Sequence, residues 1–481
     1  MKRLLLAAGL VLVALLLYAV VGHGLVNYDT LYALDWGRDL GHGRLPDYAV
    51  SVAPTPHPLA TLIGLLFTPL SSHSRHGVTG EGAAQVAVAL AFLALALLGW
   101  VVFRLGQAWF NTPAGILAAV IVLTRQPVLD FGARAYVDIP YVALVLGALL
   151  IETRRSRAGA PVLGLLAVAG LLRPEAWLFS GAYVVWLAWS PSHRADRGRL
   201  LGLVALAALA PVLWLAADLA VTGNPLYSLT GTRSTARVLG RVTGLQHVPG
   251  TAPRRLGEIL REPVLFGAAA GAILSLAWLH RRAWLGAVTG VLALIAFSIL
   301  ATAGLSILGR YLLLPAAILA IFCGAGAFGW MLVPRGDRRR RRRWQLAAAA
   351  VAVALVVFIP AQVHRISALR STLAAQNRIQ IDLATLIRRG SIGAACQPIA
   401  VPNHRPVPLL ALWLDVAPRD VISAQERIPT RGSYVTPANR QVANAYILDP
   451  RDPVKVVAGV PAGFAPAGGD AAWRVYRRCG A

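Results

Sequence analysis

Acidic residues gather in one polar segment near the start of an otherwise apolar chain. The segment 27–58 carries four aspartates: Asp29, Asp35, Asp39 and Asp47. A carboxylate close to a membrane surface and among aromatic side chains is partly desolvated, and it can act as a general base that removes a proton from a hydroxyl group. Asp29 follows Tyr28 and lies nearest to the preceding apolar run, so it is the candidate base. We expect the other three aspartates to belong to a solvated loop.

Two later polar segments combine a carboxylate with an arginine. In 125–141, Arg134 precedes Asp138 by four residues, and Asp138 is placed to begin an apolar helix. Asp138 is either a second carboxylate facing the same cavity or a capping residue in a helical ion pair. Arg173 and Glu175 lie in a tight hairpin between two apolar runs, where they line a protein cavity or form only a turn ion pair.

Arginines mark two further segments. The polar stretch 222–263 holds six of them: Arg233, Arg237, Arg241, Arg254, Arg255 and Arg261. Guanidinium groups bind phosphate bidentately, so this stretch predicts an anionic partner such as a lipid phosphate. General attraction to anionic headgroups is the alternative. Farther on, Arg310 and Tyr311 begin another apolar run, where Arg310 is a phosphate ligand or an anchor that reaches the membrane surface.

The elements that carry these residues belong to a membrane. Of the 481 residues, 57% are hydrophobic and 14% are charged, against roughly 25% charged residues in an ordinary soluble domain. The mean hydropathy is +0.61. These values exclude a soluble enzyme, a disordered chain and a small disulfide-stapled module. The net charge of +25 comes mostly from short breaks between apolar runs, which indicates the positive-inside pattern and not nucleic-acid binding.

Eleven spans are predicted from runs of apolar residues. They cover residues 4–22, 84–103, 113–125, 137–151, 160–172, 175–189, 200–221, 264–280, 283–303, 310–333 and 345–362. Basic breaks such as Arg281-Arg282 and the run Arg338–Arg343 predict a cytoplasmic N-terminus in a multi-pass protein of the plasma membrane. The shorter apolar piece Leu59–Leu70 predicts an interfacial or re-entrant helix.

An odd number of spans places residues 364–481 outside the cytoplasm. This tail has the composition of a small mixed α/β domain, and its leucines and isoleucines predict a helix over Ala368–Arg388. Cys396 and Cys479 are free to form a disulfide there, whereas Cys323 lies in an apolar run and is expected to be inert packing. The predicted organisation is therefore a membrane domain over 1–363 and an extracytoplasmic domain over 364–481.

In order along residues 1–330, these segments resemble the GT-C superfamily of integral membrane glycosyltransferases. The similar members use polyprenyl-phosphate sugars, as protein O-mannosyltransferases and actinobacterial mannosyl- and arabinofuranosyltransferases do. The matching segments are Tyr28-Asp29, the first-loop residues 43–47 and 54–58, Ala135–Pro140, LLRPEAWL at 171–178, and Gly309–Pro315. One departure is that Asp29 stands between Tyr28 and Thr30, where the family often has two adjacent acidic residues.

The resemblance implies an all-α, GT-C-like membrane enzyme, a hexosyl- or pentosyltransferase of cell-envelope assembly. It implies transfer of a sugar from a polyprenyl-phosphate donor to a hydroxyl acceptor on a glycan, lipid or protein, with inversion and with Asp29 as the base. The residues implied to contact the substrates are Tyr28, His57, Arg134, Tyr136, Asp138, Arg173, Glu175, Arg233, Arg237, Arg310 and Tyr311. A divalent cation, Mg²⁺ or Mn²⁺, at Asp138 is left open, and His57 is equally interpretable as a loop histidine with a structural hydrogen bond.

Two other classes of protein remain open at this point. One is a transporter or flippase for a lipid-linked saccharide, and the other is a non-catalytic envelope scaffold. Transporters are typically built from repeats with ion sites at broken helices in mid-membrane. Here the ionisable residues cluster at the predicted outer ends of the spans, which favours the enzyme.

Overall fold

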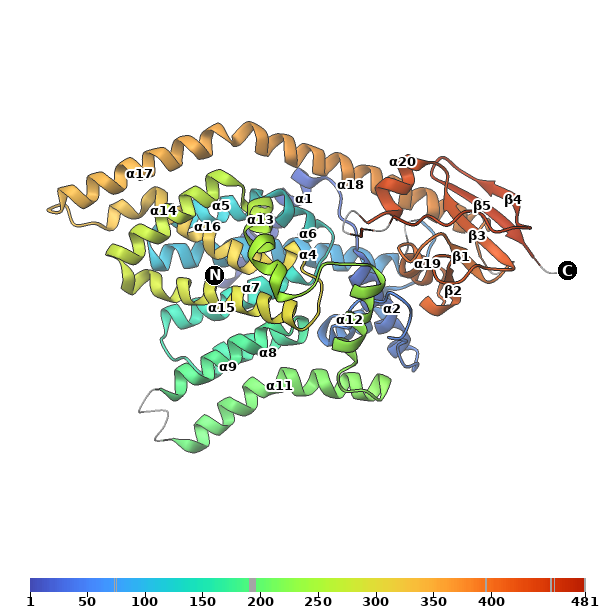
Figure 1. Ribbon diagram of the computed structural model, residues 1–481, viewed down its shortest axis with the longest axis horizontal. Helices are drawn as coiled ribbons and strands as arrows, with labels where there is room; N and C mark the ends of the chain where they lie inside the picture. The colour runs from blue at the N-terminus through green and yellow to red at the C-terminus, as the bar shows by residue number, and fades with distance from the viewer. Residues whose placement is uncertain are drawn as a thin grey trace.

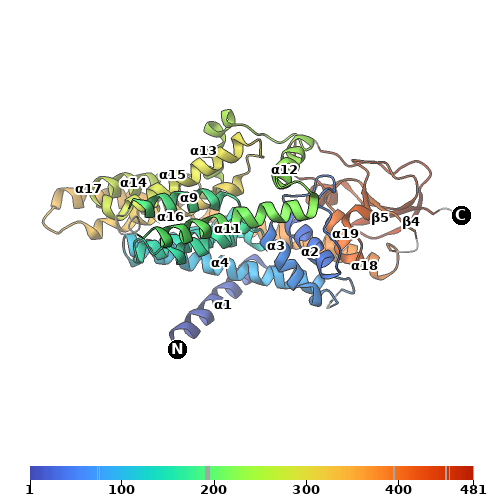
Figure 2. The same ribbon diagram turned by 90° about the horizontal axis from the view of Figure 1, so that it is seen from below.

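The computed structural model describes residues 1–72, 74, 76–189, 196–393, 396–449, 452–453 and 455–479. A bundle of helices runs along the long axis of the molecule, and a small unit containing all the described strands lies at one end (Figure 1). The N-terminal helix projects from the side of the bundle, away from that unit (Figure 2).

Each predicted span falls on a helix. These helices are α1 (Lys2–Val21), α4 (Glu81–Trp109), α5 (Thr112–Thr124), α7 (Asp138–Arg154), α8 (Ala160–Leu172), α9 (Glu175–Ala188), α11 (Arg197–Thr222), α14 (Glu262–Trp278), α15 (His280–Thr302), α16 (Leu313–Phe328) and α17 (Arg338–Val357). Among the described residues, five helices are long and apolar enough to cross a membrane, or up to eight if each bent pair is one span. The protein is thus a polytopic helical protein with fewer candidate spans than predicted. The helices α7, α8 and α9, of 17, 13 and 14 residues, are short of the roughly 20 that a span needs.

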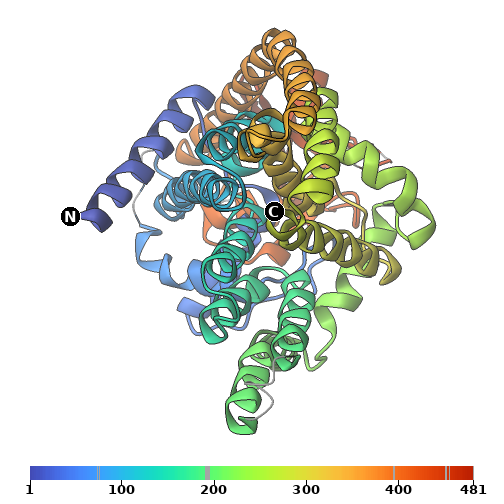
Figure 3. The same ribbon diagram turned by 90° about the vertical axis from the view of Figure 1, so that its left-hand side faces the viewer.

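The bundle is centred on α16, whose side chains are almost all buried. Small residues let its neighbours approach closely. A Cβ added at Gly271 of α14 would lie 1.8 Å from the Phe322 carbonyl oxygen, so only glycine fits there. The helix α1 lies at the periphery of the bundle (Figure 3). Its side chains Leu4, Leu12 and Leu15 are 76%, 59% and 60% exposed. An apolar helix surface this large is suited to contact with lipid and not with water.

Shorter helices occupy the segments between the long ones. They are α2 (Tyr28–Gly41), α3 (Pro58–Leu66), η1 (Thr68–Leu70), α6 (Gln126–Ala133), α12 (Tyr227–Val238), η2 (Leu245–His247), α13 (Val248–Leu260), η3 (Gly309–Leu312) and η4 (Gly329–Leu332). The expected interfacial or re-entrant piece forms α3 and η1. It packs against α2 at Gly37 and Gly64, where a Cβ on Gly37 would lie 2.3 Å from the Gly64 carbonyl carbon.

The expectation of a solvated loop for Asp35 and Asp39 is wrong. Both residues lie in α2, and they are 0% and 3% exposed. Asp35 is 3.4 Å from the Arg38 guanidinium, and Asp39 accepts a hydrogen bond of 2.9 Å from Arg44. The burial of Asp35 among other acidic groups raises the pKa of its carboxyl well above the ordinary value.

The C-terminal unit is mixed α/β, as predicted. Its elements are α18 (Ile359–Arg388), β1 (Ile399–Val401), α19 (Val407–Leu414), η5 (Pro418–Asp420), β2 (Val421–Ser423), β3 (Gly432–Pro437), α20 (Arg440–Val442), η6 (Ala443–Ile447), β4 (Ala465–Gly469) and β5 (Trp473–Arg478). The sheet order is β2-β1-β3-β5-β4, with β1 parallel to β2 and β3, and β5 antiparallel to β3 and β4. The predicted helix Ala368–Arg388 is the later part of α18.

No sharp border separates the two parts of the chain. The helix α18 runs through the predicted boundary at 363/364. One hydrophobic core joins Leu31 and Leu34 of α2 to Leu410 of α19 and Trp473 of β5. The first polar segment is therefore packed between the bundle and the sheet.

Cys396 and Cys479 are joined by a disulfide across a separation of 83 residues, and Cys323 is free and buried. A disulfide typically stabilises a protein by about 2–4 kcal/mol. We expect a reductant to speed proteolysis of residues 396–479 in the wild type and in Cys323→Ala. The Cys396→Ser variant should already be cleaved fast and should not respond. Maleimide labelling of the denatured, unreduced protein should count one thiol, and three labelled thiols would contradict the disulfide.

Candidate active site

The candidate base Asp29 is held at the start of α2 by a network around Asn27. The Asn27 side chain accepts hydrogen bonds from the backbone amides of Asp29 and Thr30, at 2.8 and 3.2 Å, which makes it the N-cap of the helix. Its amide donates to the Arg134 carbonyl at 2.8 Å, and the Thr30 hydroxyl donates to the Ala135 carbonyl at 2.8 Å. The start of α2 is thus fixed to the turn that leads into α7.

Acidic and basic side chains alternate from Asp29 into the bundle. Arg310 of η3 donates to Asp29 at 2.7 Å, and its Nε lies 4.0 Å from Asp138 Oδ2. Asp138, the first residue of α7, accepts a hydrogen bond from Arg173. Arg173 also donates through Nε to Glu175 at 3.0 Å. We call these five residues the acidic centre, because three carboxylates share two guanidinium groups.

Two tyrosines flank the guanidinium groups of the acidic centre. Arg310 lies over the ring of Tyr136, with 5.1 Å between its guanidinium carbon and the ring centroid, and 5.5 Å from that of Tyr311. Arg173 lies 4.1 Å from the centroid of Tyr311. Such cation–π contacts add attraction on the faces of the guanidinium groups, where no hydrogen bond is possible. Both arginines are therefore held in defined orientations.

Exposure divides the acidic centre into a closed and an open part. Asp138, Arg173 and Glu175 are 1%, 5% and 8% exposed. The side chains of Asp29 and Arg310 are 17% and 12% exposed. These two residues line a narrow cavity, so they are the members of the acidic centre that a ligand can touch.

The same cavity is lined by side chains from distant parts of the chain. They include Tyr28, Thr55, Thr232, Arg241, Ser306, Tyr311, His404 and Arg405. Arg241 is held by Asp452 at 2.8 Å, and Arg405 donates to Asp449 at 3.3 Å. The cavity thus combines one carboxylate with three arginines, an arrangement suited to an anion beside a proton-accepting group. We call it the arginine cavity.

Sequence reasoning found only part of this cavity. Arg241 belongs to the predicted arginine-rich segment but was not distinguished from its neighbours there. Arg405 and His404 lie in the C-terminal unit without any local pattern that marks them. Tyr28 lines the cavity as predicted, and its hydroxyl donates to the Val52 carbonyl at 3.1 Å. Burial raises the pKa of Tyr28, so its phenol stays protonated.

His57 lies among the charges of the acidic centre but does not line the arginine cavity. It is the N-cap residue of α3, and its ring contacts Trp214 edge-on with centroids 5.8 Å apart. Burial, and then the nearby Arg173, lower the pKa of His57 to about 3. A neutral imidazole is therefore expected at physiological pH, without a charge to offer a phosphate.

Three predicted contact residues point elsewhere. Arg134 pairs with Asp130 at 2.7 Å, so the alternative of a helical ion pair between Arg134 and Asp138 is wrong. Arg233 donates to the Ala303 carbonyl, and Arg237 is exposed. None of these three arginines is among the described residues that line the arginine cavity. Their role in binding stays a prediction.

The acidic centre does not fit a metal ion. In the part of the chain that the structure describes, no group of three or more His, Cys, Asp or Glu side chains is arranged to hold one. Asp138 accepts from Arg173, and its other oxygen lies 4.0 Å from Arg310. Two guanidinium groups repel a cation, so the Mg²⁺ or Mn²⁺ left open for Asp138 is not supported by these residues.

The fold has a counterpart among solved structures. The chain superposes on a crystal structure of ArnT from Cupriavidus metallidurans bound to undecaprenyl phosphate, with a TM-score of 0.51, 14% sequence identity and coverage of 97% of each chain. No protein-family model and no curated protein sequence matches the chain. The protein therefore has an ArnT-like fold, in agreement with the GT-C-like fold predicted from sequence.

Arg173 should be essential for stability because it separates two buried carboxylates. In Arg173→Leu, Asp138 and Glu175 lose their shared partner inside the protein, which costs about 3–5 kcal/mol. The matched control is Arg254→Leu, because Arg254 also pairs with a glutamate but its side chain is 76% exposed; the expected loss is under about 1 kcal/mol. Reversible unfolding in detergent, followed by tryptophan fluorescence, measures both. If both variants lost the same free energy of unfolding, the buried ion pairs of the acidic centre would contribute no more to stability than an exposed ion pair.

Proposed function

We propose that this protein is a membrane glycosyltransferase that moves a sugar from a polyprenyl-phosphate donor to a hydroxyl acceptor. The ArnT-like fold over 97% of the chain supports this class of enzyme. The observation that carries the proposal is the Asp29–Arg310 pair at the edge of a cavity lined by two further arginines, Arg241 and Arg405. A base and an anion site then lie side by side, as the reaction requires.

The reaction needs a proton acceptor at the attacking hydroxyl. Asp29 takes this proton as the acceptor oxygen attacks the anomeric carbon of the donor sugar. The bond between that carbon and the phosphate oxygen breaks, and the lipid phosphate leaves with the electron pair. Attack opposite to the leaving group inverts the anomeric configuration.

Charge on the departing phosphate is the main electrostatic problem of this step. Guanidinium groups that are already oriented in a site shielded from water stabilise such charge strongly. Arg310 has this role in our proposal, together with Arg241 and Arg405, which line the same cavity. A phosphate that binds Arg310 competes with Asp29 for its hydrogen bonds, and this competition makes Asp29 available to the acceptor.

The closed part of the acidic centre positions Arg310. Asp138 lies beside the Arg310 Nε and accepts a hydrogen bond from Arg173, whose other side donates to Glu175. Tyr136 and Tyr311 fix the plane of the guanidinium. These residues are assigned a positioning role and no contact with the reacting atoms.

The membrane orientation that we propose for the enzyme follows from the distribution of basic residues. The arginine run 338–343 lies at the end of the bundle away from the C-terminal unit (Figure 1). We propose a cytoplasmic N-terminus, a membrane domain over 1–363 and an extracytoplasmic domain over 364–481, with the reaction on the outer face of the plasma membrane. The donor sugar is proposed to be a hexose or pentose, such as mannose or arabinofuranose, and the acceptor a glycan, lipid or protein of the envelope.

The test is the release of undecaprenyl phosphate. Wild-type protein in nanodiscs receives synthetic undecaprenyl-phosphate mannose or arabinofuranose together with an envelope extract as acceptor, and mass spectrometry measures the lipid product. In Asp29→Asn the release should fall by roughly 10²–10⁴-fold, because the general base is lost. Asp47→Asn, in the same polar segment but outside the arginine cavity, should stay close to wild type.

Two results would argue against the proposal. Undiminished release in a correctly folded Asp29→Asn protein would remove Asp29 from the reaction. Absence of release from the wild type, combined with rapid movement of a fluorescent undecaprenyl-phosphate sugar across the bilayer, would favour the flippase.

A further inference from the structure

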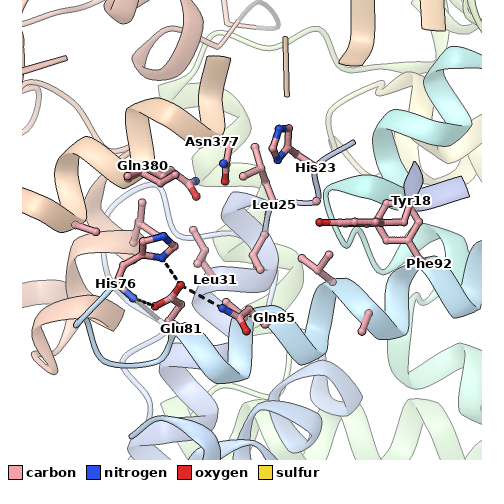
Figure 4. A pocket seen from close by; sticks show the side chains of 18 of the residues that line it. Tyr18, His23, Leu25, Leu31, His76, Glu81, Gln85, Phe92, Asn377 and Gln380 are labelled. Carbon is pink, nitrogen blue, oxygen red and sulfur yellow. Dashed lines mark hydrogen bonds and ion pairs between the residues drawn. The ribbon is translucent and has the colours of Figure 1, made fainter. Parts of the chain in front are cut away.

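A second and larger cavity lies on the opposite side of the segment that carries Asp29. It is a groove between α1, α4 and α18, and Figure 4 shows the side chains that line it. Leu25 and Leu31 form part of its wall, while Tyr28 and Asp29 between them face the arginine cavity. The groove and the proposed active site are therefore separated by a single stretch of chain.

One half of the groove is apolar. It is formed by Val11, Ala14, Leu15 and Tyr18 of α1 and by Val88, Ala89, Phe92 and Leu93 of α4. Both helices are candidate membrane spans. Side chains at this depth of a span meet hydrocarbon, so the natural occupant of this half is a lipid chain.

The other half of the groove is polar. In Figure 4, His76, Glu81 and Gln85 face Asn377 and Gln380 of α18. Glu81 accepts hydrogen bonds from the Gln85 amide at 3.2 Å and from the His76 backbone amide at 2.8 Å. Amides, an imidazole and a carboxylate offer donors and acceptors suited to hydroxyl groups.

Charge distinguishes the two cavities. The described residues that line the groove include no arginine or lysine, whereas the arginine cavity contains three arginines. The Glu81 carboxylate is paired with the His76 ring and adds no site for a phosphate. The head of a lipid that fits here is therefore uncharged and carries hydroxyl groups.

We propose that this groove is a binding site for a neutral glycolipid, separate from the site proposed for the donor phosphate. The lipid chain lies between α1 and α4, and the sugar head contacts Asn377, Gln380 and the Glu81 cluster. The assignment rests on the groove itself and holds whether or not the protein transfers sugars.

Photo-crosslinking in nanodiscs tests this site in the full-length protein. The probes are monoglucosyl diacylglycerol and phosphatidylglycerol with the same diazirine-bearing chain, at equal mole fraction, and peptide mapping locates the label. We expect the glucosyl lipid to label the peptides around residues 11–18 and 84–93 about two- to tenfold more than phosphatidylglycerol, the ratio that one net hydrogen bond gives.

Two sets of variants separate the chain site from the head site. Ala89→Trp fills the apolar half and should abolish labelling there by either probe. Its matched control is Leu90→Trp, because Leu90 is the next residue on α4, is 46% exposed and does not line the groove. The double variant Asn377→Leu with Gln380→Leu should keep the labelling but lose the preference for the glucosyl lipid.

Three outcomes would overturn the proposal. Equal labelling by both probes would show ordinary boundary lipid. Labelling that Ala89→Trp does not change would place the lipid outside the groove. Stronger labelling by phosphatidylglycerol would show an anionic headgroup and contradict the neutral head. Size-exclusion profiles and thermal stability of each variant establish that the protein is folded in every comparison.

Discussion

A charge inside a protein is stable only beside its opposite, and this constraint organises the bundle around Arg173. Removing an ion from water costs several kcal/mol unless a partner replaces the solvent. Asp138, Arg173 and Glu175 are all buried, so the start of α7 and the hairpin between α8 and α9 must meet. Arg310 extends this arrangement to η3, and Asp29 extends it to α2. The open edge of the acidic centre is therefore positioned by its closed part.

The same constraint ties the C-terminal unit to α2. The Arg38 guanidinium donates to the carbonyls of Ala411, Leu412 and Val416, and it lies 3.4 Å from Asp35. A buried arginine needs this many acceptors because it carries five N–H groups and no lone pair. The C-terminal unit thereby contributes Arg405 to a cavity whose carboxylate, Asp29, comes from the second helix of the chain.

How well the sequence predicts an interaction depends on how far apart the two interacting residues lie along the chain. Isolated charges in apolar surroundings are easy to recognise, and Asp138, Arg173, Glu175 and Arg310 do come together. Which residue an arginine pairs with is not decided locally. Asp130 and Asp138 are each four residues from Arg134, so sequence spacing cannot tell which of them forms the ion pair. Asp35 was assigned to solvent for the same reason, since the carbonyls that bury its neighbour Arg38 lie more than 370 residues away. Eleven spans were predicted, whereas five described helices, or up to eight with the bent pairs, have the length and composition of a span. The difference lies partly in α7, α8 and α9, which are apolar but short.

The core shared by α2, α19 and β5 has a consequence for how such a protein can change over generations. A C-terminal unit that hung on a linker could be exchanged between relatives as an independent module. Here Leu31, Leu34 and Leu410 belong to one hydrophobic core, and α18 continues through the junction as one helix. A chimera joined at this junction would combine two halves of a core that did not evolve together. The bundle and the C-terminal unit are therefore expected to evolve as one unit.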